Sequence, residues 1–215
     1  MFRILVVDDH PLVRESLKTL FRREADLAVC GEAEDREQAL ERAAAREPDL
    51  ALVDLTLKNS HGLELIKDLL NLWPKMKILV LSMQDETFYA ERVIRAGARG
   101  YISKQETPSK VLLAIRHILA GNIYWSEKAA AHVASKIAGS PRSSANLSVE
   151  ILTDRELQVF ELIGIGKNTR QIAATLHINA STVETYRARI KDKLNLKNAL
   201  ELLQYAIRCS NDQKI

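Results

Sequence analysis

The sequence predicts an α/β domain with a doubly wound parallel sheet, followed by a smaller domain made only of helices. Short apolar runs alternate with segments of helical periodicity through residues 1–124, which is the pattern of repeated strand–helix units. The run Leu50–Val53 is apolar at every position, as expected for a strand that is buried on both faces. From residue 149 onward the apolar residues recur at helical spacing. A chain of 215 residues has room for one large domain or two small ones.

Five strands and five helices are expected in the first domain, in alternation. The strands are predicted at Arg3–Val7, Leu27–Cys30, Leu50–Val53, Ile78–Leu81 and Gly100–Ile102. The helices are predicted at Pro11–Phe21, Arg36–Arg46, Leu63–Leu72, Phe88–Ala96 and Ser109–Ala120. Pro11 favours a first helical position, whereas Pro74 and Gly97 end the third and fourth helices. Right-handed crossovers then favour the flavodoxin-like strand order 2-1-3-4-5.

Polar residues follow four of these strands at their carboxyl ends. They are Asp8 and Asp9, Asp54, Ser82 and Lys104. The carboxyl ends of parallel strands meet at one edge of the sheet, which is where ligands bind in such folds. Carboxylate oxygens suit Mg²⁺, a lysine ammonium neutralises an anion, and a serine hydroxyl can donate to an anion oxygen. The set therefore predicts a phosphoryl site in which Asp54 is the nucleophile.

Each of these residues also has an ordinary structural explanation. Asp8 and Asp9 could form a solvated turn that starts a helix, and Asp54 could be a loop carboxylate. Ser82 and Lys104 could be a surface serine and lysine. Their joint placement at the ends of four strands favours the phosphoryl site over an independent structural role for each residue.

An enzyme is the main rival function. Phosphatases with an aspartate nucleophile also use Mg²⁺, carboxylates and a lysine. They would carry the nucleophile in the first-strand motif, with a second aspartate two residues later. In this chain Asp8 and Asp9 are adjacent and position 10 is His10, and the second domain would have no role.

Composition places the chain among ordinary globular proteins, with 47% hydrophobic and 27% charged residues. The apolar run Ile4–Val7 is too short for a signal peptide, and no segment reaches the length of a membrane span. Cys30 and Cys209 lie far apart, so neither a disulfide framework nor a zinc site is indicated. We expect a cytoplasmic protein with no membrane partner.

Residues 125–148 are expected to form an interdomain linker. The segment Gly139–Ser144 is small and polar with one proline, which is typical of a loop. A short helix is predicted over Lys128–Ile137. The domains on either side are then predicted at residues 1–124 and 149–215.

Four helices are expected in the second domain. The pattern Thr153-Asp154-Arg155-Glu156 fits a capping box at the start of a helix that ends near Gly164. The other helices are predicted at Thr169–Leu176, Ser181–Leu194 and Lys197–Ile207. The pair of short helices joined by a tight connection is the helix-turn-helix pattern.

Basic residues concentrate in this second domain. The segment 167–197 carries seven Lys and Arg residues against two acidic ones, a local charge of +5, whereas the whole chain is only +3. This distribution predicts a polyanionic partner for this part of the chain. Arg187, Arg189, Lys191 and Lys193 would meet DNA phosphates, and the start of the third helix would contact bases. A basic helix face that is merely solvated is the alternative.

The first domain resembles the receiver domain of bacterial two-component response regulators. The resemblance rests on Val6–Pro11, Val53–Leu55, Leu81–Ser82 and Ala96–Lys104. It implies that Asp54 accepts a phosphoryl group from a sensor histidine kinase. It also implies that Mg²⁺ is bound by Asp9, Asp54 and the backbone carbonyl of Thr56, with Asp8 acting through water.

The same resemblance assigns roles to three further residues. Ser82 and Lys104 would contact the phosphoryl group, and Tyr101 would be an aromatic switch that follows Ser82 inward. A half-buried aromatic on an edge strand is the alternative for Tyr101. Lys58 stands where this family often has proline, so we expect a less rigid loop after Asp54 and an extra cation near it.

The second domain is similar to the LuxR-type helix-turn-helix domain, and the combination to the NarL/FixJ class of response regulators. The similarity rests on Leu152–Glu156, Asn168–Ala173, Ser181–Glu184 and Lys193–Leu194. It implies DNA contacts from Thr169, Arg170, Thr182, Glu184, Thr185, Arg187, Ala188, Arg189, Lys191 and Lys193.

Glu184 and the last helix leave alternatives open. Family members often carry lysine at the positions of Glu184 and Ala188. Glu184 either accepts a hydrogen bond from a cytosine amino group or forms a capping box with Ser181, and we favour the capping box. The last helix, through Leu200, Leu203 and Ile207, either forms a dimer or closes the domain core.

Together these features predict a phosphorylation-dependent transcriptional regulator. Phosphorylation of Asp54 by a sensor histidine kinase would produce a homodimer that binds double-stranded promoter DNA. Apart from self-phosphorylation and self-dephosphorylation with Mg²⁺, we expect no enzyme activity. A receiver that acts without phosphorylation is a third possibility, which the complete set of site residues disfavours.

Overall fold

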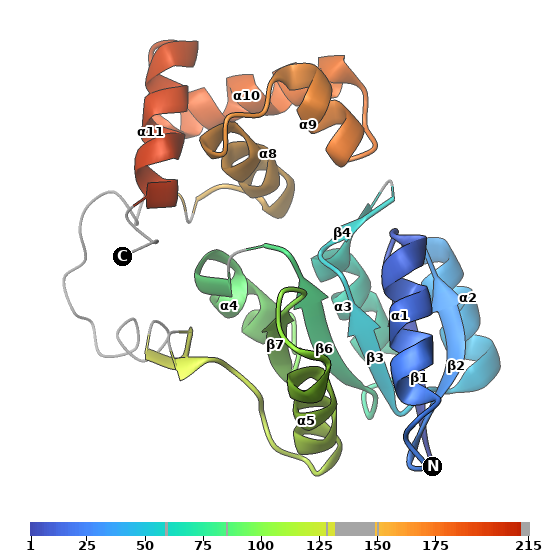
Figure 1. The fold of residues 1–215 in the computed structure, drawn as a ribbon. Helices are drawn as coiled ribbons and strands as arrows, with labels where there is room; N and C mark the ends of the chain where they lie inside the picture. Colours follow the sequence, from blue (N-terminus) through green and yellow to red (C-terminus); the bar gives the residue numbers. More distant parts are fainter. Residues whose placement is uncertain (59, 85, 128, 132–148, 150, 212–215) are drawn as a thin grey trace. The chain divides into compact units, whose positions relative to one another are not determined.

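A computed structural model describes residues 1–215 except for 59, 85, 128, 132–148, 150 and 212–215 (Figure 1). The chain forms two compact units, residues 1–138 and 139–215, and each is described by itself. The predicted linker helix over 128–137 and the loop over 139–144 lie outside the described residues, apart from 129–131. The limits of the linker, residues 125–148, stay a prediction. Within the described residues, no helix combines the length and the apolar character that a membrane crossing requires.

A five-stranded parallel sheet forms the centre of the N-terminal unit. Its strands are β1 (Phe2–Val7), β2 (Leu27–Ala33), β3 (Leu50–Val53), β6 (Lys77–Ser82) and β7 (Gly100–Ser103). They are hydrogen-bonded in the order β2-β1-β3-β6-β7, and every neighbouring pair is parallel. The predicted strand order 2-1-3-4-5 is therefore confirmed. All five strands end at the same edge, so residues far apart in the sequence meet there.

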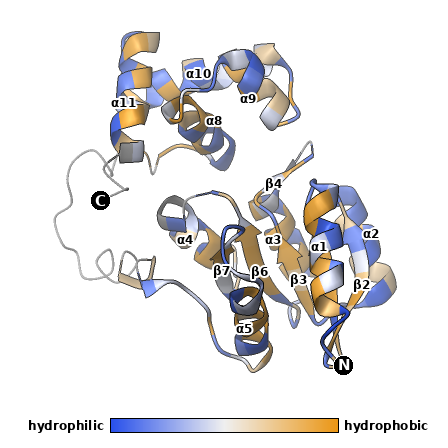
Figure 2. Ribbon diagram, viewed as in Figure 1, coloured by the Kyte–Doolittle hydropathy of each residue, from blue (hydrophilic) through white to orange (hydrophobic). Residues whose placement is uncertain are grey.

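Five helices cover the sheet on its two faces (Figure 1). They are α1 (Pro11–Phe21), α2 (Arg36–Arg46), α3 (Gly62–Leu72), α4 (Glu86–Arg95) and α5 (Pro108–Leu119). Apolar residues of α1 and α5 pack with alternate residues of the strands, including Ile4, Leu52 and Leu79, in one buried cluster. The intervening strand residues, such as Ala51 and Val80, are also fully buried. Figure 2 shows the sheet as the most hydrophobic layer of this unit.

Apart from element ends that shift by one or two residues, two features of this unit differ from the sequence prediction. Strand β2 extends to Ala33, three residues beyond the predicted end, and its pairing with β1 shifts register between Ile4 and Leu5. A two-stranded antiparallel hairpin, β4 (Thr56–Leu57) and β5 (Ser60–His61), follows Asp54. Both were missed because the polar and small residues of these strands give no apolar run or alternation.

Four described helices form the C-terminal unit: α8 (Asp154–Gly164), α9 (Thr169–Thr175), α10 (Ala180–Leu194) and α11 (Ala199–Asn211). The predicted capping box of Thr153 and Glu156 is confirmed, and α9 begins with a second one. The core contains the fully buried Val183 and Ile190 of α10. Phe160 of α8 packs against Tyr205 of α11, with ring centroids 5.8 Å apart.

The predicted capping box of Ser181 and Glu184 is wrong. Helix α10 begins at Ala180 with Asn179 as its N-cap, and no side chain caps it. Ser181 is therefore the second residue of the helix, where its hydroxyl cannot act as an N-cap. Glu184 instead accepts a hydrogen bond from the Thr169 hydroxyl, with the two oxygens 2.6 Å apart.

Candidate functional site

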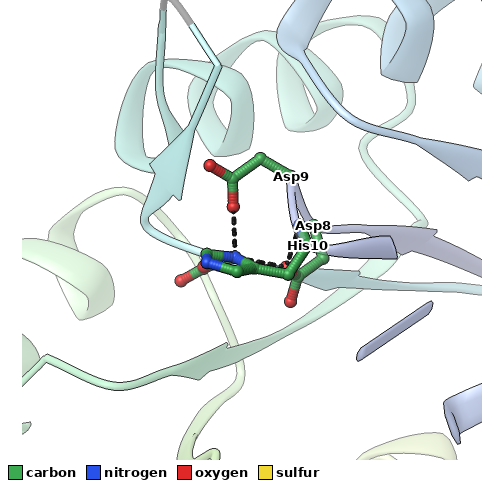
Figure 3. A group of neighbouring side chains, drawn as sticks. Asp8, Asp9 and His10 are labelled. Carbon is green, nitrogen blue, oxygen red and sulfur yellow. Dashed lines mark hydrogen bonds and ion pairs between the residues drawn. The ribbon is translucent and has the colours of Figure 1, made fainter. Parts of the chain in front are cut away.

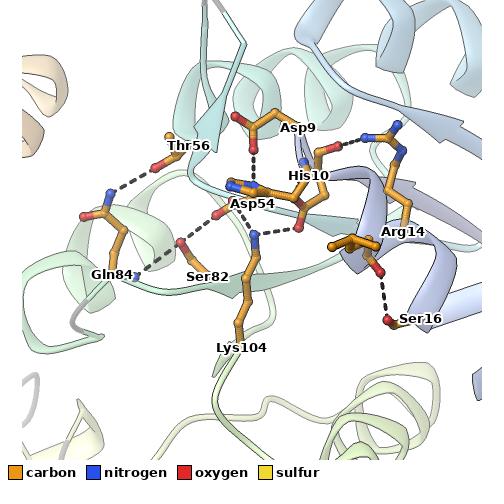
Figure 4. A network of polar contacts seen from close by, with 11 residues as sticks. Asp9, His10, Arg14, Ser16, Asp54, Thr56, Ser82, Gln84 and Lys104 are labelled. Atoms are coloured by element: carbon orange, nitrogen blue, oxygen red, sulfur yellow. Dashed lines mark hydrogen bonds and ion pairs between the residues drawn. The ribbon is translucent and has the colours of Figure 1, made fainter. Parts of the chain in front are cut away.

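Asp54 lies at the carboxyl edge of the sheet, directly after β3, and both of its carboxylate oxygens accept hydrogen bonds (Figure 4). The Ser82 hydroxyl donates to Oδ1 over 2.6 Å, and the Lys104 ammonium donates to Oδ2 over 2.6 Å. Lys104 Nζ also lies 2.6 Å from Oδ2 of Asp8. The predicted residues Asp8, Asp54, Ser82 and Lys104 are thus brought together, from the ends of four strands.

These groups are almost inaccessible to water. Asp54 is 3% exposed, Asp8 2% and Ser82 1%, and the Lys104 side chain is 8% exposed. Burial raises the pKa of the Asp54 carboxyl, the Lys104 ammonium opposes that rise, and Asp8 adds to it. Burial alone would lower the pKa of Lys104, but Asp54 and Asp8 outweigh it and raise that pKa. The lysine therefore stays charged and compensates two desolvated carboxyl groups.

Asp9 completes an acidic group next to Asp54, and His10 lies against it (Figure 3). His10 Nδ1 is 2.6 Å from Oδ1 of Asp9 and 3.3 Å from Oδ1 of Asp8. One ligand atom each from Asp8, Asp9, His10 and Asp54 lies within 4.8 Å of the others. Three carboxylates at this spacing fit a hard divalent cation with oxygen ligands. His10 was not among the predicted site residues, although it directly follows the two aspartates in the sequence.

Gln84 contacts the segment after Asp54 through Thr56 (Figure 4), and it also contacts Tyr101. Its side-chain amide donates to the Thr56 hydroxyl over 3.0 Å, and its backbone carbonyl accepts from the Tyr101 hydroxyl over 2.7 Å. Tyr101 is 2% exposed, so its ring is packed inside the unit. Sequence reasoning missed Gln84, because nothing in its neighbourhood marks a residue that contacts two distant segments.

The hairpin after Asp54 is held by two local features. Lys58 Nζ lies 2.8 Å from Oε1 of Glu34, so its ammonium is paired with that carboxylate at the rim of the unit. The amide of Gly62 donates to the carbonyl of Leu55 over 2.9 Å. A Cβ atom at Gly62 would lie 2.1 Å from the backbone oxygen of Asp54, so only glycine fits this contact.

The predicted DNA-contacting residues lie on α9 and α10 of the C-terminal unit. Glu184, Thr185, Ala188 and Arg189 are exposed on α10, as is Arg170 on α9. Thr169, Thr182, Arg187 and Lys191 are half-buried. Val183 and Ile190 face the core of the unit, so the exposed residues of α10 lie on the opposite side of that helix. Arg170 lies on the surface of α9.

Lys193 differs from the other predicted contacts because its ammonium is paired with a buried carboxylate of α8. Its ammonium lies 2.6 Å from Oε2 of Glu156, and the same oxygen accepts from the amide of Thr153 over 2.7 Å. Glu156 is 2% exposed. Burial raises the pKa of Glu156, but Lys193 and Thr153 outweigh burial, so the pKa lies below its ordinary value of 4.5. The pair joins α10 to the start of α8.

Replacing Glu156 by glutamine should destabilise the C-terminal unit by about 1–3 kcal/mol at pH 7. Because folding lowers the pKa of Glu156, its stabilisation is present above pH 4.5 and is lost as the pH falls further through the folded-state value. The glutamine variant should lack this loss. Hydrogen exchange of peptides from α8 and α10, measured from pH 7 down to pH 3, checks both effects, with the exposed Asp192→Asn as the control. Equal pH dependence in wild type and Glu156→Gln would contradict the assignment.

Comparison with protein families divides the chain in the same way as the fold. Residues 4–116 match the response regulator receiver domain. Residues 150–206 match the bacterial regulatory proteins of the luxR family.

Similar proteins span the whole chain. A Pseudomonas aeruginosa protein, provisionally assigned as a transcriptional regulator, is 36% identical over 208 residues, which cover 97% of this chain and 98% of that protein. The oxygen regulatory protein NreC of Staphylococcus aureus is 33% identical, covering 96% of this chain and 97% of its own.

Solved structures agree with the fold. A LuxR-family two-component response regulator from Aurantimonas sp. SI85-9A1 is 33% identical with a TM-score of 0.59, covering 64% of this chain and 99% of its own. RcsB of Salmonella enterica, bound to the promoter rprA with a phosphomimetic, has a TM-score of 0.62 at 22% identity, covering 95% of this chain and 98% of its own. The chain therefore belongs to the LuxR family of two-component response regulators, with a receiver domain followed by a LuxR-type DNA-binding domain.

Proposed function

We propose that this transcriptional response regulator is controlled by phosphorylation of Asp54 and then binds promoter DNA as a homodimer. The observation that carries the proposal is the buried Asp54 carboxylate, with Ser82 on one oxygen and Lys104 on the other. The phosphoryl donor is a sensor histidine kinase, and the place of action is the cytoplasm.

In the transfer step, a carboxylate oxygen of Asp54 attacks the phosphorus of a phosphohistidine. The new P–O bond forms as the P–N bond breaks, and the electron pair of the P–N bond stays on the leaving imidazole, whose other ring nitrogen carries a proton. Ser82 and Lys104 hold the carboxylate oxygens before the reaction and would hold phosphoryl oxygens after it. Such fixed donors supply positioning and charge stabilisation, which dominate phosphoryl transfer.

Asp8, Asp9, Asp54 and the carbonyl of Thr56 would hold Mg²⁺. The closeness of three carboxylates supports this, because two desolvated acidic side chains and an incoming phosphoryl group need more positive charge than Lys104 supplies. A bound Mg²⁺ supplies that charge and orients phosphoryl oxygens.

Intact mass after incubation with acetyl phosphate and Mg²⁺ tests the acceptor. Wild type should gain one phosphoryl group and Asp54→Ala none. Asp49→Ala is the matched control, because Asp49 precedes β3 whereas Asp54 follows it, and this variant should be phosphorylated like wild type. Phosphorylation of Asp54→Ala to the wild-type extent would refute the proposal.

Tyr101 is proposed as the residue that transmits phosphorylation. Its buried hydroxyl bonds to the carbonyl of Gln84, two residues after Ser82, so a shift of Ser82 toward a phosphoryl group would act on this contact. Tyr101→Phe removes the donor and should weaken beryllofluoride-induced dimerisation about fivefold while leaving phosphorylation intact. Sedimentation velocity measures the dimer, with Tyr124→Phe as the control. Identical dimerisation of Tyr101→Phe and wild type would exclude the switch role.

DNA contacts are proposed for α9 and α10. The exposed Arg170 and Arg189, with Arg187 and Lys191, would bind phosphates, and Thr182, Glu184, Thr185 and Ala188 would approach bases. Thr169 donates a hydrogen bond to Glu184, so we place it with the residues that approach bases. Lys193 is the weakest phosphate candidate, because Glu156 already holds its ammonium. Steep salt dependence of the affinity is the expected signature of phosphate contacts.

A further inference from the structure

Four side chains, one at the start of α9 and three on α10, offer no free hydrogen-bond donor, and we call them the acceptor patch. It consists of Thr169, Glu184, Thr185 and Ala188. Glu184 is 60% exposed and carries a carboxylate, which accepts hydrogen bonds and donates none. Ala188 is exposed one helical turn after Glu184 and offers only a methyl group.

The hydroxyl groups of the two threonines in the patch already donate hydrogen bonds within the C-terminal unit. Thr169 donates to Oε1 of Glu184 over 2.6 Å, and Thr185 donates to the backbone carbonyl of Ser181 over 3.0 Å. What they present outward is therefore a methyl group and oxygen lone pairs. All four members of the patch can accept hydrogen bonds or make apolar contacts.

The carboxylate of Glu184 is held in place from two sides. Thr169 is the first residue of α9, after the capping box of Asn168 and Gln171, so its backbone is fixed. On the other side, Nε of Arg187 lies 3.8 Å from Oε2 of Glu184, and the Arg187 side chain is only 19% exposed. A carboxylate held in this way loses little conformational entropy when it binds a donor.

We propose that Glu184, oriented by Thr169, selects cytosine in the DNA site. The inference rests on the proposed DNA-binding function and adds the chemistry of the base that is read. In the major groove, guanine and thymine present acceptors, which a carboxylate repels, whereas cytosine and adenine present amino donors. The amino group of adenine stands beside the acceptor N7, which would face the second oxygen of Glu184. On the side of its amino group away from the paired guanine, cytosine has only a C–H group where adenine has N7, so cytosine fits best.

The test begins with selection of duplexes from a randomised pool by the full wild-type chain with Mg²⁺ and beryllofluoride. Dissociation constants are then measured for all four base pairs at each position of the selected site. One position in each half-site should hold cytosine, preferred about tenfold over every other base.

Three substitutions assign that position. Glu184→Gln supplies an amide, which bonds well to adenine, so the preference should move from cytosine to adenine at that position alone. Thr169→Val keeps the shape but removes the donor, and should reduce the cytosine preference to about threefold. Thr169→Ser keeps the donor and should retain the wild-type preference. Arg189→Ala should weaken binding to all duplexes alike, as expected for a phosphate contact.

Two outcomes would overturn the inference. In one, Glu184→Gln has the same base preference as wild type at every position; in the other, the position that responds to Glu184 holds guanine or thymine. Failure of the wild-type chain to select any duplex is a different result. It would overturn the proposed DNA-binding function itself, on which the selection of cytosine depends.

Discussion

Replacement of Lys104 by methionine should destabilise the receiver unit by about 3–5 kcal/mol in the presence of a metal chelator. Lys104 Nζ lies 2.6 Å from both Asp8 and Asp54, and its side chain is only 8% exposed. Methionine keeps most of the apolar stem but leaves two buried carboxyl groups without a cation. Removing one partner of a buried ion pair is costly, because the remaining charge is desolvated and uncompensated.

Tryptophan fluorescence in urea measures this effect selectively. The two tryptophans of the chain, Trp73 and Trp125, both belong to the N-terminal unit. Added Mg²⁺ should restore more stability to Lys104→Met than to wild type, because the cation replaces the missing charge. Lys110→Met is the matched control: its ion pair with Glu106 is exposed, and its loss should cost less than about 1 kcal/mol. Equal unfolding midpoints for Lys104→Met and Lys110→Met would contradict the argument.

Replacement of Gly62 by alanine should cost about 3 kcal/mol or more and should slow phosphorylation of Asp54. The new Cβ would lie 2.1 Å from the oxygen of Asp54 and 2.8 Å from Cα of Leu55, and both are backbone atoms that no side-chain rotation can move. Relief of the clash therefore requires a shift of α3 or of the segment that carries the acceptor. Either shift alters the position of the Asp54 carboxylate.

Gly121→Ala separates this clash from the general cost of losing a glycine. Gly121 has a φ of +96°, and a Cβ atom there would meet nothing within 4 Å, so alanine should cost only about 1–2 kcal/mol of backbone strain. Urea unfolding followed by tryptophan fluorescence compares the two variants, and the rate of mass gain with acetyl phosphate tests the acceptor. The clash argument fails if Gly62→Ala is no less stable than Gly121→Ala.

The sheet and the grouping of Asp54, Ser82 and Lys104 could be predicted because both follow from short-range patterns. Continuous apolar runs mark buried parallel strands, and parallel strands bring the residues that follow them to one edge. Strand β2 was predicted too short because Gly31 and Glu32 interrupt its apolar run. The register of its pairing with β1 depends on both strands, whereas sequence periodicity describes one strand at a time.

Contacts between distant polar side chains could not be predicted. Gln84 bonds to Thr56, 28 residues away, and Lys193 lies 37 residues from Glu156. Such pairs depend on how whole elements pack, and a single glutamine or lysine carries no local sign of its partner. The N-cap of α10 was predicted wrongly because Asn179 and Ser181 are both residue types that favour this position, so residue type alone does not choose between them.

The parallel order of the strands also has a consequence for the timing of synthesis. Asp8 leaves the ribosome first, Asp54 follows, and Lys104 comes last, directly after the strand that completes the edge of the sheet. Until β7 has joined the sheet, the two aspartates lack the lysine that compensates them. A nascent chain thus has no finished acceptor site while β7 is still missing. The ability of Asp54 to be phosphorylated therefore indicates that the receiver has been synthesised and folded through β7, the last strand of its sheet.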